Sequence, residues 1–347
     1  MKKFFSVILC VALVLSVLCF AGCNKDTGNN GDNGDNTNNN KETLKLGLGV
    51  YSEATKATNA DGDTNGQGEV EFTAAAVLVD TDGKIVKCVV DTAQNKVAYT
   101  SEGKAIANDS FKTKYELGAD YNMVAYGGAA KEWFEQADAF CALVVGKTAA
   151  EVKALVAEGD KGTDEVISAG CTIMIADFVY AVDAAVANAT ASDATADSTL
   201  KLGMYTLLEG KDATEDKDGE SKLETTVFAA AVGADKKIIA ASSDCVQVKF
   251  TFNAAGESTY DLAKEVKSKK QLGAAYNMSA YGADLNGDGT VKEWFEQAAI
   301  FDAACVGKTA GDVQALLADT NYGTAELQNA GCTILVNGFV AAAAKIG

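Results

Sequence analysis

Apolar and polar residues follow one pattern in the first half of a long stretch of the chain and a different one in its second half. Residues Phe72 to Val79 form a short apolar run that predicts a buried strand. The Asp82-Gly83 pair that follows is a hairpin signal, and residues 84–91 and 96–100 are compatible with two further strands. This half therefore predicts an antiparallel meander.

The second half changes to a helical period. Its apolar stripe consists of Trp133, Ala137, Phe140 and Val144. Thr148 and Glu151 then have the form of a capping box that starts a second helix, and a third helix is expected from about Asp177 to Asn188. Strands followed by helices, without strict alternation, predict an α+β fold.

The whole pattern occurs twice in the same order. The matching segments begin at residues 43 and 199 (TLKLG), 116 and 271 (ELGADYN and QLGAAYN), 131 and 292 (KEWFEQA), 145 and 306 (VGKTA), and 169 and 330 (AGCTI). We therefore predict two homologous domains, residues 43–189 and 199–347, joined by a linker of residues 190–198. Each should be a meander followed by packed helices. Because Asp235-Lys236 replaces Asp82-Gly83 in the second copy, we expect a different turn or a longer loop there.

The N-terminus predicts export. Lys2 and Lys3 precede an apolar run that ends at Phe20, which is typical of a secretory signal peptide over residues 1–22 and is too short to span a membrane. Residues 24–41 contain no aromatic or aliphatic side chain, so residues 23–42 are predicted to be a disordered Asn/Gly/Asp tether.

The residues FAGC at the end of this run resemble the lipobox of bacterial lipoproteins. The resemblance implies cleavage before Cys23, a diacylglycerol group on its sulfur, and a lipid-anchored position on the extracytoplasmic face of the cell membrane. The alternative is an ordinary cysteine that follows a type I cleavage site.

The balance of charge limits the partners. The chain has 30 basic and 48 acidic residues, and loss of Lys2 and Lys3 with the signal leaves 28 against 48, a net charge of −20. Such a polyanion is not expected to bind nucleic acid. Cations, neutral small molecules or a basic protein surface remain as partners.

The chain contains no histidine and no proline. The absence of histidine excludes Ser-His and Cys-His catalysis and His-ligated zinc, haem and copper. Beyond Cys23 there is no CxxC pair, and the cysteines there are either buried apolar side chains or, in an oxidising exterior, disulfide partners. They are Cys88, Cys141, Cys171, Cys245, Cys305 and Cys332.

The repeated VGKT segment is similar to the end of a phosphate-binding P-loop. That loop needs a glycine five residues before the Gly of GKT, where this chain has Cys141 and Asp302. A helix N-cap explains the segment better.

An insertion in the second copy, DLNGDGTVKEWFE, follows the first half of an EF-hand loop. Asp284, Asn286 and Asp288 occupy ligand positions, but the twelfth position is Phe295. Either Glu293 or Glu296 would have to complete a calcium site, and the alternative is a polar, glycine-rich turn.

The segment SAGCTIMIADFVYAVDAAVANA, from Ser168, resembles the closing segment of FMN-binding domains. These domains occur in extracellular electron-transfer lipoproteins and in flavin subunits of sodium-pumping and Rnf-type complexes, where a D-x-x-S/T-G-A-T signature precedes the final helix. A flavin transferase esterifies its threonine to the phosphate of FMN. By position, Gly170 and Gly331 match the glycine, and Thr172 and Thr333 match the acceptor threonine.

The segment departs from that signature at three positions. Cys171 and Cys332 replace its alanine, Ala169 and Ala330 replace its Ser/Thr, and no Asp stands six residues before the threonine. A small residue and a glycine before a hydroxyl would still let a bulky donor approach the backbone, and a following helix N-terminus favours phosphate. The alternative is a tight turn in which the threonine is a local cap.

These observations leave an electron carrier or a binding protein favoured over an enzyme. In the first hypothesis, FMN on Thr172 and Thr333 relays electrons from a membrane donor to an external acceptor. In the second, degenerate FMN-binding-like repeats form a non-catalytic surface binding or adhesion module. A third is a solute-binding lipoprotein steadied by calcium.

Overall fold

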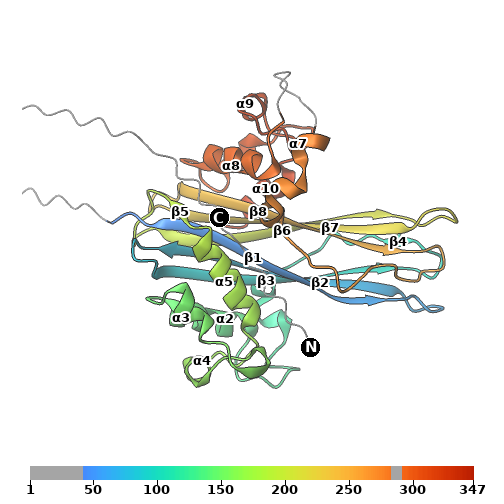
Figure 1. The fold of residues 1–347 in the computed structure, drawn as a ribbon, viewed down its shortest axis with the longest axis horizontal. Coiled ribbons are helices and arrows are strands. Elements are labelled where there is room, and N and C mark those ends of the chain that lie inside the picture. Colours follow the sequence, from blue (N-terminus) through green and yellow to red (C-terminus); the bar gives the residue numbers. More distant parts are fainter. Residues whose placement is uncertain (1–41, 283–290) are drawn as a thin grey trace, which may run out of the picture. The chain divides into compact units, whose positions relative to one another are not determined.

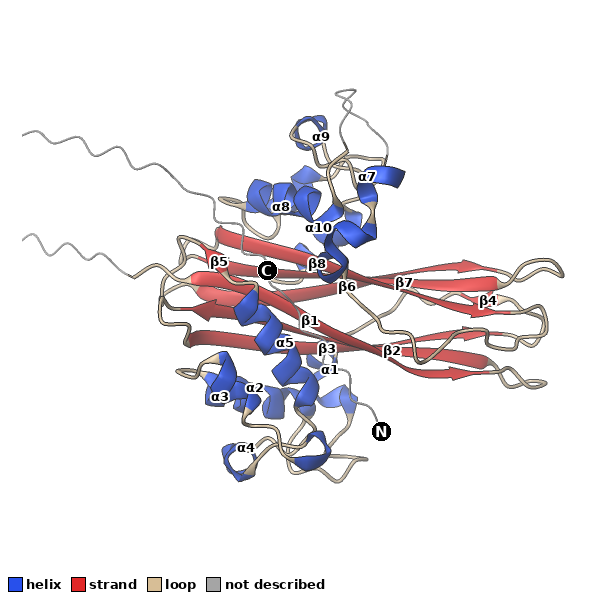
Figure 2. Ribbon diagram, in the orientation of Figure 1, coloured by secondary structure: helices blue, strands red, loops and turns tan. Residues whose placement is uncertain are grey.

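The computed structural model describes residues 42–282 and 291–347. Within them, the chain forms two antiparallel sheets and two groups of helices (Figures 1 and 2). The sheets have the strand orders β4-β3-β2-β1-β5 and β6-β7-β8. The predicted α+β fold, with a meander followed by helices in each repeat, is confirmed.

Each repeat supplies three long strands and a set of short helices. The first repeat contains β1 (Lys45–Thr58), β2 (Gly66–Val79), β3 (Ile85–Tyr99), β4 (Ala105–Ile106), α1 (Lys114–Leu117), α2 (Trp133–Val144), α3 (Ala149–Lys153), α4 (Asp164–Ala169), α5 (Ala176–Ala187) and β5 (Thr190–Ala191). The second contains β6 (Thr199–Lys211), β7 (Gly219–Val232), β8 (Ile238–Phe252), α6 (Lys269–Leu272), α7 (Met278–Tyr281), α8 (Trp294–Cys305), α9 (Ala325–Asn329) and α10 (Asn337–Ala344). Short 3-10 helices cover Gly118–Tyr121, Glu158–Asp160, Gly273–Tyr276 and Asp312–Leu316.

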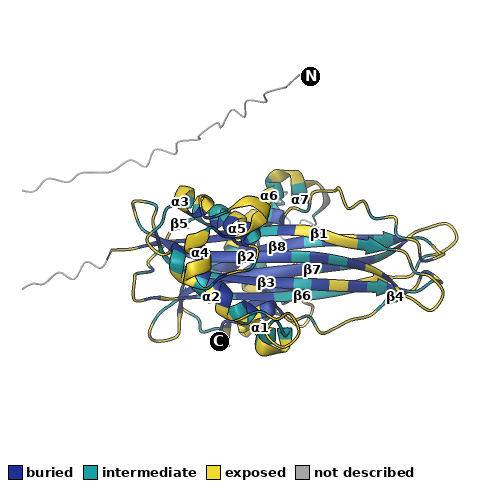
Figure 3. Ribbon diagram, turned by 90° about the horizontal axis from the view of Figure 1, so that it is seen from below, coloured by how far each residue is buried: buried dark blue, intermediate teal, exposed yellow. Residues whose placement is uncertain are grey.

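The two sheets pack face to face, and the helices of each repeat cover the outer face of its own sheet (Figure 1). Strand β2 shows how this is encoded, because its residues alternate between two buried faces. Phe72, Ala74 and Leu78 belong to the core between the sheets, whereas Ala75 and Val77 belong to the core under the helices. A strand buried on both faces is apolar throughout, which explains the unbroken run in the sequence. Buried residues accordingly run along the strands of both sheets (Figure 3).

The repeats are related by an approximate two-fold arrangement. Strand β1 of the first repeat contacts β8 of the second, and β3 contacts β6. The segment predicted to be a linker takes part in this structure. Within it, β5 pairs with β1, and Ala194 is fully buried and accepts a hydrogen bond from Leu44 N at 2.7 Å.

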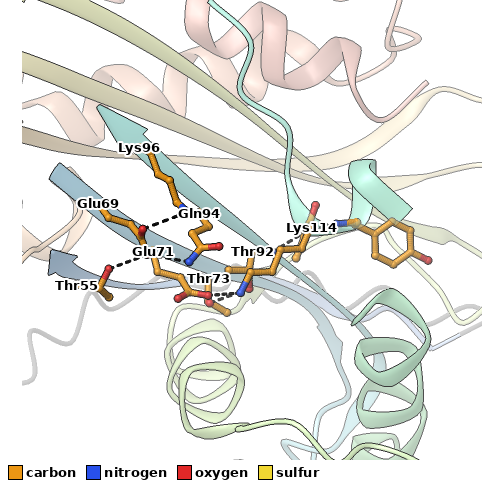
Figure 4. Close-up of polar contacts among 10 residues, drawn as sticks. Thr55, Glu69, Glu71, Thr73, Thr92, Gln94, Lys96 and Lys114 are labelled. Atoms are coloured by element: carbon orange, nitrogen blue, oxygen red, sulfur yellow. Dashed lines mark hydrogen bonds and ion pairs between the residues drawn. The ribbon is translucent and has the colours of Figure 1, made fainter. Parts of the chain in front are cut away.

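The prediction of two strands over residues 84–91 and 96–100 is wrong, because β3 is continuous. Residues 92–95 continue the ladder with β2, and the polar Thr92 and Gln94 find polar partners there (Figure 4). Thr92 and Thr73 share a buried hydrogen bond of 2.9 Å, and Gln94 Nε2 donates to Glu69 at 2.8 Å. Strand β2 likewise begins six residues before the predicted Phe72, at Gly66.

The expectation of a different turn in the second repeat is also wrong. Both hairpins close with the same spacing, Val79 opposite Ile85 and Val232 opposite Ile238. Lys236 adopts φ = 64°, close to the 80° of Gly83. The turn is retained, and a lysine accepts a conformation that suits glycine.

The helical predictions are confirmed. The four stripe residues of α2 are buried, Thr148 and Glu151 form the capping box of α3, and α5 covers the third predicted helix. Helix α5 lies directly against β1 because Gly47 and Gly49 have no side chain. A Cβ on either would overlap the backbone of α5. No helix within residues 42–282 and 291–347 is long and apolar enough to cross a membrane.

Candidate functional site

The glycine of each AGCT segment ends a helix. Gly170 has φ = 101°, and its N–H donates to Ile167 O at 3.0 Å while Cys171 N donates to Val166 O at 3.2 Å. This is the left-handed cap that closes a helix C-terminus, and any side chain at this φ would be strained. Gly331 repeats the arrangement, also with φ = 101°. Helix termination therefore accounts for the matched glycines.

The threonine after each glycine is held by a buried glutamine. Gln136 Oε1 accepts from Thr172 N at 2.8 Å and from Thr172 Oγ at 2.9 Å. In the second repeat, Gln297 Oε1 accepts from Thr333 N at 2.7 Å and from Oγ at 3.1 Å. Both glutamines are at most 1% exposed. A buried amide thus fixes the orientation of each threonine hydroxyl.

A lysine side chain lies over the glycine of each turn. Gln136 Nε2 donates to Lys131 O at 3.0 Å, and Gln297 Nε2 donates to Lys292 O at 2.8 Å. The side chain of Lys131 reaches back across the turn, where a Cβ added to Gly170 would overlap its Nζ. A Cβ on Gly331 would lie 3.0 Å from Lys292 Cε. The KEWFEQA and AGCTI motifs, about 40 residues apart in sequence, therefore form one structural unit.

The exposure of the threonine residue differs between the copies. Thr172 is exposed, whereas Thr333 is half-buried. The preceding cysteines point into the cores, and burial raises the thiol pKa of Cys171 to about 11 and that of Cys332 to about 12. Cysteine thus replaces the alanine of the FMN signature on the core side of the turn, away from the hydroxyl. The described cysteines beyond Cys23 are all free thiols.

The following helix begins several residues after each threonine. Helix α5 starts at Ala176 and α10 starts at Asn337. Helix α2 begins at Trp133, and Glu132 is its N-cap. The Glu135 carboxylate accepts from Glu132 N at 2.8 Å, and the Glu132 carboxylate accepts from Met123 N at 3.0 Å. Each AGCT turn therefore has a lysine, Lys131 or Lys292, close to its glycine.

A second polar unit lies on the outer face of each sheet. Lys114 is 8% exposed, forms an ion pair with Glu71 (Figure 4), and lies 5.4 Å from the ring centre of Tyr121 and 5.7 Å from that of Trp133. The second repeat has the same unit. Lys269 pairs with Glu224 at 3.3 Å and lies 5.3 Å from the rings of both Tyr276 and Trp294. These ion pairs with cation–π contacts tie the helices to the sheets.

A buried aspartate anchors the helix that carries each of these lysines. Asp91 Oδ1 accepts from Thr92 N at 2.7 Å and from Tyr115 N at 3.1 Å. Asp244 makes the matching bonds with Cys245 N at 2.7 Å and Lys270 N at 3.1 Å. Burial raises the pKa of Asp91 to about 7 and raises that of Asp244.

The calcium ligands proposed from the sequence, Asp284, Asn286 and Asp288, lie outside the described residues. The two glutamates that could complete such a site are engaged elsewhere. Glu293 accepts from Met278 N at 2.9 Å, and Glu296 accepts from Glu293 N at 2.8 Å. In the described part of the chain, no three His, Cys, Asp or Glu residues are grouped to hold a metal.

Sequence reasoning missed Gln136, Lys131 and Lys114 as partners of the predicted residues. Their signal was present, because each has a counterpart at the matching position of the second repeat: Gln297, Lys292 and Lys269. The P-loop alternative at VGKT is replaced by the cap of α3.

Comparison of the chain with protein-family models, with curated proteins and with solved structures gave no match.

Proposed function

We propose that this protein is a lipoprotein, anchored through Cys23 at the extracytoplasmic face of the cell membrane, that carries FMN on Thr172 and Thr333. It would relay electrons from a membrane donor to an external acceptor. One observation carries the proposal: a buried glutamine orients each threonine hydroxyl, a lysine side chain lies over the glycine of the same turn, and both repeats keep the arrangement. Thr172 is also exposed, as a modification site must be.

The residues of the turn fit a phosphoester. Attachment forms a bond between Thr172 Oγ and the FMN phosphorus of flavin adenine dinucleotide, breaks the pyrophosphate bond of that donor, and releases AMP as the leaving group together with the hydroxyl proton. Lys131 and Lys292 would offset the charge of the phosphate. A flavin transferase is the partner that this step requires. FMN, when attached, supplies the redox chemistry, while the protein positions it.

The test is co-expression of the full chain with a flavin transferase, followed by absorbance spectroscopy and peptide mass mapping. Flavin absorbance and an FMN mass increase on the peptides containing Thr172 and Thr333 are expected. Thr172→Val should abolish the increase on the first peptide alone. Thr172→Ser keeps a hydroxyl for Gln136 to accept from, and it is the matched control that should retain the modification.

A folded, colourless protein with unmodified threonines would overturn covalent attachment. It would favour a second candidate, a non-catalytic surface binding or adhesion module. The observation in favour of this candidate is that local structure alone accounts for the motif, since Gly170 caps α4 and Thr172 binds Gln136. With a mature net charge of −20, nucleic acid is not expected as a partner of either form.

A further inference from the structure

Two grooves at the edges of the sandwich are related by the repeats, but their sizes differ. One lies between β1, residues 190–193, the start of β8 and helices α6 and α8, with a volume of about 1130 Å³. The other lies between β6, the start of β3, α1 and the end of the chain, with a volume of about 360 Å³. Strands β1 and β8 and helix α6 match β6, β3 and α1, whereas residues 190–193 and α8 line only the larger groove.

Lys345 lines the smaller groove, and Lys87 lies two residues before Val89, a residue of its wall in β3. Lys345 forms an ion pair with Glu116, and Lys87 donates to Ser198 O at 2.6 Å. In the larger groove, the positions that match these lysines are Ala184 and Ala240, and Gln271 matches Glu116. Alanines thus stand where the smaller groove has lysines, and Ala240 lines the larger groove.

The larger groove also has polar groups that its counterpart lacks. Asp302 is 6% exposed and accepts from Ser243 N at 3.0 Å and from Ser243 Oγ at 2.6 Å. Lys270 donates to Ser242 Oγ at 3.2 Å. At the matching positions of the first repeat stand the apolar or uncharged residues Cys141, Val90, Tyr115 and Val89.

Lys270 and Asp302 leave hydrogen-bonding capacity unused. Their Nζ and Oδ2 atoms are 3.8 Å apart, too far for a good hydrogen bond. An ammonium has three N–H donors, and a carboxylate has about four acceptor positions, of which Ser243 fills two. The pair therefore presents one donor and one acceptor side by side.

We propose that this groove binds a planar aromatic molecule with a cis-amide edge, in which a ring C=O and the adjacent ring N–H point the same way. The C=O accepts from Lys270, and the N–H donates to Asp302. The ring body lies along the apolar side chains of the groove, which include the exposed Phe295 and Val306 together with Leu46, Leu48 and Ala240. An apolar cleft with a few converging polar groups is the usual form of a small-molecule site.

The test uses 2-quinolinone, which has this edge and is fluorescent, and N-methyl-2-quinolinone, which lacks the N–H donor. Both are titrated into the full mature chain. We expect 2-quinolinone to bind and the N-methyl compound to bind at least about tenfold more weakly, since a site left with an unpaired polar group discriminates strongly. Lys270→Met should weaken 2-quinolinone binding by about tenfold or more.

Two further variants separate the groove from general effects on folding. Asp302→Cys introduces the residue that the first repeat has at this position, Cys141, and should also weaken 2-quinolinone binding. Glu116→Gln introduces into the smaller groove the residue that the second repeat has, and it should leave 2-quinolinone binding unchanged. Thr172→Val with Thr333→Val should not affect it, so the outcome is independent of flavin attachment. Equal affinity for the two compounds, undetectable binding of 2-quinolinone, or unchanged affinity in both Lys270→Met and Asp302→Cys would overturn the proposal.

Discussion

Asp91 is a carboxyl group whose burial opposes its ionisation. Three hydrogen-bond donors, the Thr113 side chain and the backbone N–H groups of Tyr115 and Thr92, favour the charged form, but desolvation outweighs them and raises its pKa to about 7. In the unfolded chain an aspartate titrates near 4. Between these values the folded state holds a proton that the unfolded state has lost, so the free energy of unfolding falls as pH rises.

We therefore predict that Asp91 contributes its full stabilisation below about pH 4 and loses it by about pH 7. Asp91→Asn, which keeps an oxygen for the same backbone donors, should flatten this decline by on the order of 3 kcal/mol. Urea unfolding of both proteins from pH 4 to 8 measures the difference. Asp82→Asn, at an exposed turn residue, is the control, and an equal slope for wild type and Asp91→Asn would contradict the prediction.

At this scale, the sequence identifies residues better than it identifies their partners. Thr172 and Trp133 are recognisable from a motif and from a helical stripe. Gln136 is not, because a glutamine one turn into an amphipathic helix is ordinarily a surface residue. Only the fold brings it to Thr172, across 36 residues of chain.

At the scale of elements, the β2–β3 and β7–β8 hairpins differ in one turn residue. Lys236 occupies the left-handed conformation, at φ = 64°, that Gly83 adopts at 80°. A residue with a side chain is strained by about 1–2 kcal/mol in this region. Glycine avoids that strain, but it loses more backbone entropy on folding, so the net gain in stability is smaller. Lys236→Gly should therefore raise the free energy of unfolding by about 0.5–1 kcal/mol.

The reciprocal change, Gly83→Lys, should lower the free energy of unfolding by a similar amount. Nothing lies within 4 Å of a Cβ added at Gly83, so backbone strain is the only local penalty. Denaturant unfolding of the two variants measures both effects. Changes of the same sign in the two variants would show that the turns are not equivalent.

The buried lysine units make a prediction about how helices are held to sheets. Lys269→Met removes the ion pair with Glu224 and the contacts with Tyr276 and Trp294, and it leaves the partly buried Glu224 unpaired. We expect a loss of about 2–3 kcal/mol, since breaking one side of a buried pair costs more than the pair contributes. Adding Glu224→Gln should restore at least about 1 kcal/mol of this.

The free energies of unfolding of wild type, Lys269→Met, Glu224→Gln and the double variant, measured by thermal or urea unfolding, form a double-mutant cycle. Lys114→Met with Glu71→Gln is the matched set in the first repeat. If the two changes were simply additive, the lysine would stabilise the protein by packing alone.

The spacing of apolar residues made it possible to predict which segments are strands and which are helices. The same spacing did not predict the lengths of the strands. Residues 92–95 read as a break, yet they lie inside β3, because other strands offer Thr92, Gln94 and Asn95 polar partners that no single-strand pattern can show. Strand β1 was not anticipated at all. Its glycines, Gly47 and Gly49, weaken a strand pattern, and their reason is the close approach of α5.

At the scale of the whole molecule, the two repeats have a common core. Side chains from both sheets form a single cluster, with Phe72 and Leu78 from one repeat and Leu223 and Phe250 from the other. Gly68 permits the sheets to approach, since a Cβ there would overlap the Phe250 ring. A polar link crosses the same interface. Asn95 Nδ2 donates to Thr206 Oγ at 3.0 Å.

The duplication was plain in the sequence, but the packing of its two copies was not, because residues that face a partner sheet look like those that face helices.

This common core predicts that one repeat is not stable alone. A protein limited to residues 42–198 would expose the inner face of its sheet, including Val70, Phe72, Ala74, Ala76 and Leu78, each at most 1% exposed in the intact chain. An apolar surface of that extent is rarely left in water by a monomeric protein. We expect this fragment to dimerise through the face that normally meets the second repeat, or to aggregate.

Size-exclusion chromatography with light scattering distinguishes these outcomes from a monomer, and the intact mature chain is the control. Phe72→Asp in the fragment sharpens the test, since a charge on the exposed face should abolish a dimer without restoring a cooperative monomer. The same substitution in the intact chain should cost several kcal/mol, because the charge would be buried between the sheets. A fragment that is monomeric and unfolds cooperatively would contradict the prediction, and the sandwich would then be two self-sufficient domains in contact.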